Sequence, residues 1–405
     1  MQDIVILGST GSIGTQALEI VAAHPGHFRI QALAASGTHL DLLARQAVEY
    51  EVPLVAVANS SVGELDQALK AAQAQSDKPP VRHHLLTGRA GVEAAAGCVP
   101  GGIVLNGIAG ISGLHATLRA LDSGAQLALA NKESLVIGGS LVREAVVRPG
   151  QITPVDSEHS AIWQALRSGK HERGLCASQV TGYTEVSRLI LTASGGPFRG
   201  KTRTELEHVT VAEALRHPTW DMGPLVTINS ATMFNKGLEV IEASLLFDID
   251  PKFIDVVVHP ASVVHSMVEF RDGATLLQAS PPDMRIPIAL GLSAPSRLRD
   301  VAPSCDWTRP VNWHFEPVDN QAFPAVNLAR QALQTSATHP AVLASADEVA
   351  VAAFLDGQLP FLGIYDVVSR VVAEHHGKNA PELAELESTL QWAKRRATEL
   401  IAEQH

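Results

Sequence analysis

The sequence predicts an α/β protein with an N-terminal parallel sheet, a central α+β region and a small C-terminal helical bundle. Short apolar runs alternate with helix-length segments as far as Val155, and this alternation stops after His159. Helical periodicity alone follows the proline-rich stretch from Ala294 to Pro317. Near-continuous apolar strands between helices are typical of a parallel sheet covered on both faces. We therefore expect domains over residues 1–156, 157–293 and 318–405, joined by a linker over 294–317.

Length and composition indicate a soluble globular protein of several domains. A chain of 405 residues is too long for one core, and 46% hydrophobic with 18% charged residues is ordinary for this class. The net charge of -11 and the scattered basic residues argue against nucleic-acid binding. Three widely spaced cysteines fit a reducing compartment such as the cytoplasm, and the N-terminus shows neither a signal peptide nor a membrane span.

The strands of the N-terminal sheet are expected at seven apolar runs. Sheets of this type bind ligands at the carboxyl ends of their strands, so the residues after each run are candidates for a site. The expected strands are Ile4 to Leu7, Phe28 to Ala35, Leu54 to Ala58, His84 to Leu86, Ile103 to Ile108, Leu127 to Ala130 and Ile152 to Val155.

The first strand end carries a glycine-rich turn that predicts dinucleotide binding. Gly8, Gly11 and Gly14 follow the strand directly, and the amphipathic run Thr15 to Ala22 comes next. Glycines at this spacing let the backbone approach a pyrophosphate at a helix N-terminus, whereas a plain tight turn is the alternative. The context favours a Rossmann-like domain.

The end of the second strand indicates NADP rather than NAD. An acid usually binds the ribose 2′-hydroxyl of NAD at this place, and the stretch Ala34 to His39 contains none. Hydroxyls and amides suit a 2′-phosphate better. We expect the cofactor to contact residues of the strand ends and of one later loop: Thr10, Gly11, Ser12, Ile13, Ser36, Gly37, Thr38, Asn131, Glu133 and Gly223.

Two later strand ends add candidates. Residues Asn106 to Gly110 lack side chains that could fill a core, which suits either backbone beside the nicotinamide or a tight turn. The polar stretch Asn131 to Ser134 follows an apolar strand, and Lys132 is a candidate catalytic cation. The alternative for Lys132 is a solvated lysine in the first turn of a helix.

The stretch from Pro154 to Ser160 contains two carboxylates that suit a shared ligand. If residues Ile152 to Glu158 are extended, Asp156 and Glu158 point to the same side. Like charges at this distance need a cation or a shared proton between them. The alternative is that Asp156 or Ser157 caps the following helix, with Glu158 in its first turn.

Two loops of the central region have unusual composition. The small-residue turn Ala193 to Phe198 follows an expected strand, Arg188 to Thr192, and either binds phosphate or is a plain turn. The loop Leu215 to Pro224 holds His217 and Trp220 between prolines. This loop is either a lid over a site or ordinary packing.

One amphipathic helix is expected from Asn229 to Leu245. Its polar side gathers Thr232, Asn235, Lys236 and Glu239, opposite an apolar stripe of Phe234, Leu238, Ile241 and Leu245. Lys236 and Glu239 alone would suit a surface ion pair. Together with the carboxylates near residue 157, they favour a site.

The remaining chain is expected to form a strand meander and four helices. The runs Phe253 to Val258, Val263 to Phe270 and Ala274 to Ala279 read as strands, because Arg271-Asp272-Gly273 is a turn signal. These strands could pair across a dimer. Four helical segments then follow the linker and end at His405.

Five stretches closely resemble the 1-deoxy-D-xylulose 5-phosphate reductoisomerase family, in order and over essentially the whole chain. They are Gly8 to Gly14, Leu129 to Leu135, Pro154 to His159, Ser194 to Phe198 and Ser230 to Glu239. The resemblance implies an NADPH-dependent oxidoreductase of the non-mevalonate isoprenoid pathway, which rearranges and reduces its substrate to 2-C-methyl-D-erythritol 4-phosphate. It also implies a homodimer whose central domain is catalytic.

The resemblance assigns roles to individual residues. The metal ligands would be Asp156, Glu158 and Glu239, a set of hard oxygen donors that suits Mg²⁺ or Mn²⁺, and also Co²⁺. Glu158 and Lys132 would handle protons. Trp220 would close over the substrate, and the other substrate contacts would be Ser157, Ser194, His217, Ser230, Asn235 and Lys236.

The chain departs from the family pattern at Ser36 to Thr38, at Ala193, where glycine is usual, and in the segment Ser168 to Val186, which looks longer. Two other functions stay open. One is a metal-independent NADP-dependent dehydrogenase of another phosphorylated sugar or semialdehyde. The other is a non-catalytic NADP-sensing protein.

Overall fold

The structure, a computed structural model, describes residues 1–220 and 222–403. Its N-terminal part is a sheet of seven parallel strands in the order β4-β3-β2-β1-β5-β6-β7. All seven expected strands are confirmed, with ends that differ by one or two residues. They are β1 Gln2–Leu7, β2 Phe28–Ala35, β3 Leu54–Val57, β4 His84–Thr87, β5 Ile103–Asn106, β6 Gln126–Leu129 and β7 Ile152–Pro154.

Helices cover both faces of this sheet, as the apolar strands require. The residues of β1 from Ile4 to Leu7 are fully buried, and their alternate side chains belong to two core clusters on opposite faces. The strand order reverses between β1 and β5, so a crevice lies at their carboxyl ends. The helices are α1 Ser12–Ala23, α2 Leu40–Glu49, α3 Val62–Ala74, α4 Gly88–Ala96, α5 Ile111–Asp122 and α6 Glu133–Ala145.

The chain turns from strand to helix around Asp156. Strand β7 ends at Pro154 and helix α7 spans Ser157–Leu166, so the expected extended stretch Ile152 to Glu158 is wrong. Asp156 occupies the N-cap position, but its side chain makes no capping hydrogen bond. Instead, the short turn leaves the carboxylate free to face the carboxyl edge of the sheet.

A second sheet has five strands in the order β11-β10-β8-β9-β12. The hairpin of β10 and β11 is confirmed, with Gly273 at φ 88° in its turn. The expected meander is wrong, because β8 lies between β9 and β10 and pairs with β9 in parallel. Parallel neighbours need a long crossover, which the helices between β8 and β9 supply. The strands are β8 Val186–Ala193, β9 Ile254–Val258, β10 Val264–Phe270, β11 Thr275–Ala279 and β12 Glu316–Pro317.

That crossover contains two helices in place of the single one expected from Asn229 to Leu245. Helix α9, Pro224–Thr232, ends at Met233, whose φ of 64° is left-handed, and α10 runs from Phe234 to Phe247. The short helix α8, Val211–Ala214, precedes them. Helix α10 packs against both α6 and α12. Lys236 and Glu239 on its polar side are buried, so this side is not a solvent-facing surface.

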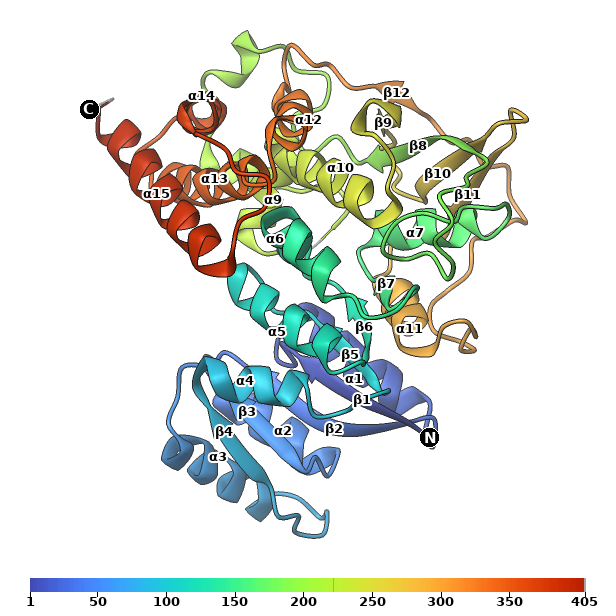
Figure 1. Ribbon diagram of the computed structural model, residues 1–405, viewed down its shortest axis with the longest axis vertical. Helices are drawn as coiled ribbons and strands as arrows, with labels where there is room; N and C mark the ends of the chain where they lie inside the picture. The colour runs from blue at the N-terminus through green and yellow to red at the C-terminus, as the bar shows by residue number, and fades with distance from the viewer. Residues whose placement is uncertain (221, 404–405) are drawn as a thin grey trace.

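Helices complete the structure. Helix α11, Arg285–Ser293, follows the second sheet in sequence but packs against α1 and β6 of the first domain. The four helices expected after the linker are confirmed, and Figure 1 shows them on one side of the molecule, above α5 and α6. They are α12 Ala325–Thr335, α13 His339–Leu355, α14 Phe361–Glu374 and α15 Leu383–Ala402.

The domain boundaries at residues 156, 293 and 317 stay a prediction. One hydrophobic cluster runs from the first sheet through the second and into the C-terminal helices. Among the described residues, no helix combines the length and apolar character needed to cross a bilayer.

Candidate active site

A cavity of about 630 Å³ lies between the two sheets and helix α10. The carboxyl ends of β6, β7 and β8 open into it, and so does the first turn of α1. It takes in most of the sequence-predicted residues: Ser12, Ile13, Lys132, Asp156, Ser157, Glu158, Ser194, His217, Trp220, Gly223, Ser230, Asn235, Lys236 and Glu239.

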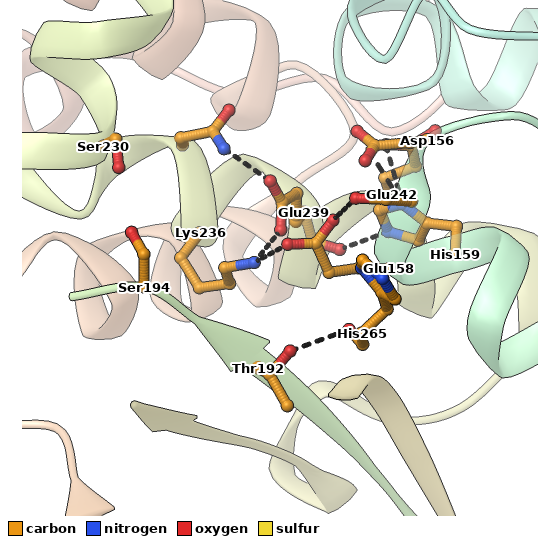
Figure 2. Close-up of polar contacts among 12 residues, drawn as sticks. Asp156, Glu158, His159, Thr192, Ser194, Ser230, Lys236, Glu239, Glu242 and His265 are labelled. Carbon is orange, nitrogen blue, oxygen red and sulfur yellow. Dashed lines mark hydrogen bonds and ion pairs between the residues drawn. The ribbon is translucent and has the colours of Figure 1, made fainter. Parts of the chain in front are cut away.

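Three carboxylates meet in this cavity. Asp156 comes from the turn after β7, Glu158 from the first turn of α7 and Glu239 from the middle of α10. Each offers an oxygen within 4.8 Å of the others (Figure 2). Because the donors are all hard oxygens and come from three separate elements, the arrangement fits Mg²⁺ or Mn²⁺.

Two lysines supply the charge that balances these carboxylates. Lys132 Nζ lies 2.7 Å from Asp156 Oδ2 and 3.2 Å from Glu239 Oε1. Lys236 Nζ lies 2.6 Å from Glu158 Oε1 and also contacts the second oxygen of Glu239. The surface-lysine and surface-ion-pair alternatives are therefore wrong, because both ammonium groups are directed into a shared, buried cluster.

Burial and neighbouring charges together shift the pKa values of this cluster. Burial tends to lower the pKa of Lys132, but the charges of Asp156 and Glu239 raise it well above its usual value. Burial also raises the pKa of Asp156, but the charge of Lys132 outweighs this and holds it below its usual range. Burial and the charge of Glu158 raise the pKa of Glu239 to about 7. Additional positive charge beside Glu239 would favour its ionisation, which is a second feature that fits a divalent cation.

Two serine hydroxyls form a second, smaller group beside the carboxylates. His217 Nε2 lies 3.0 Å from Ser194 Oγ and 3.0 Å from Ser230 Oγ. His217 Nδ1 accepts hydrogen bonds from the backbone N–H groups of Thr219 and Trp220, at 3.1 and 2.9 Å. Nε2 must then carry the proton of a neutral ring, and burial lowers the pKa of His217 accordingly. The ring thus holds both serines and the following loop.

The turn after β8 and the loop before α9 border this pair of serine hydroxyls. Gly195 and Gly196 both have left-handed φ values, 84° and 63°, and Gly196 N donates to Ser194 Oγ. Trp220 lines the cavity, with its ring centroid 6.3 Å from that of His265. The expected closing loop, His217 to Met222, includes Asp221, which lies outside the described residues.

The glycine-rich turn has the geometry expected of a nucleotide-binding turn. Gly8 has φ 80°, and a Cβ on Gly14 would lie 2.3 Å from Gly8 O, so neither position accepts a side chain. Helix α1 begins at Ser12, directly after Gly11. At the neighbouring strand end, Ser36 Oγ lies 3.1 Å from Thr38 Oγ1, on either side of Gly37.

Asn131 and Glu133 are engaged inside the protein. Asn131 Nδ2 donates to Glu133 Oε2 at 2.6 Å, and Asn131 Oδ1 accepts from Ser134 N at 2.9 Å. The amide therefore fastens the start of α6, on which Lys132 sits. Direct cofactor contacts by these two side chains stay a prediction.

Sequence reasoning assigned no role to several buried groups around the carboxylates. His159 is fully buried, and its Nε2 lies 2.9 Å from the backbone oxygen of Glu239. Its Nδ1 lies 3.4 Å from Glu242 Oε2, so His159 ties α7 to α10. Asp156, His159 and Glu242 form a second group with metal-ligand spacing. The spacing of Glu239 and Glu242, three residues apart on one helix, is the signal that identifies Glu242.

The fold and the site together define a class of protein. A nucleotide-binding domain with a glycine-rich turn borders a cavity that contains three carboxylates suited to a metal ion and a pair of serine hydroxyls. This is the organisation of a metal-dependent nicotinamide oxidoreductase. Sequence models of 1-deoxy-D-xylulose 5-phosphate reductoisomerase match residues 4–139, those of its C-terminal domain match residues 152–247, and a further DXP reductoisomerase C-terminal domain matches residues 279–396. The chain belongs to the 1-deoxy-D-xylulose 5-phosphate reductoisomerase family.

Individual relatives agree over nearly the full length. The chain is 54% identical to 1-deoxy-D-xylulose 5-phosphate reductoisomerase from Bifidobacterium longum subsp. infantis, covering 99% of this chain and 98% of the relative. It resembles the enzyme from Zymomonas mobilis in complex with NADPH, with a TM-score of 0.85, 35% identity and 99% of each chain covered. It also resembles DOX-P reductoisomerase in complex with NADPH, fosmidomycin and magnesium, with a TM-score of 0.86, 33% identity and coverage of 99% and 98%.

Proposed function

We infer that the protein converts 1-deoxy-D-xylulose 5-phosphate to 2-C-methyl-D-erythritol 4-phosphate, using NADPH and a divalent metal ion. The observation that carries this inference is the meeting of Asp156, Glu158 and Glu239 within 4.8 Å at the carboxyl edge of a nucleotide-binding sheet. A metal-independent dehydrogenase does not need three carboxylates arranged to bind a metal ion. A non-catalytic sensing protein does not need a buried lysine beside these carboxylates.

Asp156, Glu158 and Glu239 would hold the metal ion, which is magnesium in similar structures of DOX-P reductoisomerase. A bound divalent ion supplies Lewis acidity at the substrate oxygens as the carbon skeleton rearranges. Lys132, which remains an ammonium ion beside Asp156, would donate hydrogen bonds to the same oxygens. Glu158 is the carboxylate we assign to proton transfer, and Ser157 Oγ donates a hydrogen bond to it at 2.5 Å.

Ser194, Ser230, Asn235 and Lys236 would bind the substrate phosphate. Figure 2 shows Lys236 between the two serines and the carboxylates. Its ammonium group here balances Glu158 and Glu239, a task that a divalent cation would take over. Lys236 could then serve the phosphate. His217 would orient the two hydroxyls, because its Nε2–H group reaches both.

NADPH would lie along the glycine-rich turn, with its pyrophosphate at the start of α1 and its 2′-phosphate near the end of β2. Ser36 and Thr38 offer hydroxyls there, and no carboxylate follows β2 before Asp41. The nicotinamide would then reach the cavity past Ser12 and Ile13, which line it. We further propose that the protein is a homodimer, for which the open strand edge of the second sheet is the support. We also propose that it is cytoplasmic, for which the three free cysteines are the support.

The deciding experiment is an assay of NADPH oxidation on addition of 1-deoxy-D-xylulose 5-phosphate, with and without a chelator. We expect oxidation that stops after chelation and returns with Mg²⁺ or Mn²⁺. Reduction of another phosphorylated sugar that survives chelation would support the metal-independent dehydrogenase. NADPH binding without turnover of any such substrate would support the sensing protein.

A further inference from the structure

A buried acid outside the cavity contacts the helix that carries Ser230. Asp347 lies on α13 and Asn229 on α9, and the two side chains are only 2% and 5% exposed. Asn229 Nδ2 donates a hydrogen bond to Asp347 Oδ2 at 2.6 Å. This contact joins the C-terminal helices to the substrate side of the protein.

The other oxygen of each side chain has no hydrogen-bond partner. Both Asp347 Oδ1 and Asn229 Oδ1 are buried acceptors, and each is left unsatisfied in the described structure. An ionised Asp347 would leave a buried charge with a single donor, which is unfavourable. A proton on Asp347 Oδ1 turns that atom into a donor. A carboxylic acid and a primary amide can form two hydrogen bonds with each other, and such a pair accounts for both unsatisfied atoms.

The electrostatic surroundings agree with a neutral acid. Burial and the charge of Glu348 raise the pKa of Asp347 to about 7, and only the hydrogen bond from Asn229 opposes this. Glu348 is itself paired with Lys394 of α15, 2.8 Å away. Helix α9 has no charged residue, and α6, α10, α12, α14 and α15 also pack on α13 without an ion pair to Asp347 among the described residues.

The pair is placed to act on the site. Asn229 directly precedes Ser230, whose hydroxyl contacts His217. Three residues after Ser230 the chain takes its left-handed turn at Met233 and enters α10. A movement of Asn229 would therefore displace the Ser230 hydroxyl first, and this hydroxyl is one that we assign to the substrate phosphate.

We propose that Asp347 is a neutral carboxylic acid that forms two reciprocal hydrogen bonds with Asn229. This pair holds α9 in place, so Asp347 is a positioning residue for Ser230. The kinetic part of this proposal rests on the proposed function, whereas the protonation state does not. Ionisation of Asp347 breaks one of the two hydrogen bonds and loosens the contact between α9 and α13.

The pH dependence follows from the direction of the shift. The carboxyl is harder to ionise in the folded protein than in the unfolded chain, where its pKa is near 3.8. The folded state then binds the extra proton, so stability falls as pH rises. The contribution of Asp347 is complete below about pH 4 and is lost as pH rises through about 7.

The test compares Asp347→Asn with wild type in thermal unfolding and in substrate kinetics, at about pH 6 and about pH 8.5. Asparagine keeps the size and both hydrogen bonds but cannot ionise. At the lower pH the folded carboxyl is still mostly protonated, so we expect KM values within about twofold and a smaller difference in melting temperature than at the higher pH. At the higher pH the wild type should melt earlier than Asp347→Asn, and its substrate KM should rise more than that of the variant. Titration of Glu239 affects both proteins alike, so the difference between them reports Asp347. The KM for NADPH should not differ.

Two further variants complete the design. Asp347→Ala leaves Asn229 unpaired, and we expect a substrate KM about tenfold higher at both pH values, with an unchanged KM for NADPH. The double variant Asn229→Asp with Asp347→Asn exchanges acid and amide, so it should restore the wild-type pH dependence even if the alanine variant does not fold. Asp356→Asn, an exposed acid at the end of the same helix, is the matched control and should show no change.

Three results would overturn the proposal. If Asp347→Asn melts below wild type at the higher pH, Asp347 is ionised. If the double variant loses the pH dependence, the pair is not reciprocal. If Asp347→Ala folds and keeps its substrate KM, Asp347 does not position Ser230. A failure of the proposed function would look different, since turnover would be missing in every protein while the melting temperatures kept their pattern.

Discussion

The balance of charge around Glu239 decides what this site can bind. Glu239 is only 1% exposed and lies against both lysines. The three carboxylates carry one more charge than the two ammonium groups when all are ionised, and burial makes that excess costly. A divalent cation would remove the excess. The chemistry of this residue therefore depends on groups from three other elements.

Glu239→Gln should lower kcat by roughly 10² or more and raise the metal concentration needed for activity. The amide keeps the size of the side chain but removes the charge of one ligand. The measurement is kcat as a function of metal concentration, with thermal unfolding to show that the protein folds.

Glu242→Gln is the matched control for this variant. Glu242 is equally buried on the same helix but faces His159, and it belongs to the other carboxylate group. Metal dependence that changes in Glu242→Gln and stays normal in Glu239→Gln would assign the metal to Asp156, His159 and Glu242.

Cofactor choice is a second property set by single residues. Ser36→Asp places a carboxylate where the ribose of NAD is usually bound and where a 2′-phosphate would be repelled. We expect wild type to prefer NADPH in kcat/KM and the variant to move toward NADH by about tenfold or more. Equal efficiency of the wild type with NADH would contradict the choice of NADPH. Ser388→Asp, at an exposed position on helix α15, tests whether any added acid has this effect.

At the scale of elements, the loop before α9 contacts His217, which holds the two serine hydroxyls, and it also lines the cavity. The backbone N–H groups of Thr219 and Trp220 both donate to His217, so the loop start is fixed to the residue that holds Ser194 and Ser230. The Trp220 ring lies beyond this attachment and lines the cavity. The start of the loop is thus held by His217, and the Trp220 ring extends from this held segment into the cavity.

Trp220→Ala should leave NADPH affinity nearly unchanged and lower kcat/KM for the substrate by a factor that corresponds to about 1 to 3 kcal/mol. The backbone bonds to His217 remain, so the loss isolates the ring. Binding of NADPH and steady-state kinetics are the two measurements. Trp307→Ala, a tryptophan that is 67% exposed in the linker, is the control. Unaltered kinetics in Trp220→Ala would mean that the ring only packs.

At the scale of the whole molecule, the two edges of the second sheet differ. Strand β12 ends in Pro317, which has no N–H group to donate, so that edge pairs poorly with another strand. Strand β11 is the opposite edge, and Leu276 and Leu277 on it are 37% and 39% exposed. An open edge with apolar side chains favours pairing with a second chain.

The protein should sediment as a dimer at micromolar concentration, and Leu277→Lys should shift it toward monomer. A charge on the edge strand opposes strand pairing between two copies. Sedimentation velocity of both proteins is the measurement, with Val311→Lys, at an exposed linker position, as the control. A monomeric wild type, or a dimer unaffected by Leu277→Lys, would remove β11 as the interface.

The sequence by itself determined the features that depend on local pattern. The seven parallel strands, the glycine turn at Gly8 and the four C-terminal helices follow from the periodicity of apolar residues and from turn chemistry, which act over a few neighbouring positions. Candidate site residues were also found locally, because polar groups after buried strands and on an otherwise apolar helix have few structural reasons to be there. Lys132, Asp156 and Glu239 were identified in this way.

Only the tertiary structure decided which of these elements meet. Periodicity does not report that β8 separates β9 from β10, or that Met233 divides α9 from α10, because both depend on packing between distant segments. Packing between distant segments also encloses the polar side of α10 and brings two lysines to the three carboxylates. It likewise creates the contact between Asn229 and Asp347. Asp347 lies 118 residues from its partner. Its environment, and hence the state of its proton, is set by burial that no local stretch of sequence encodes.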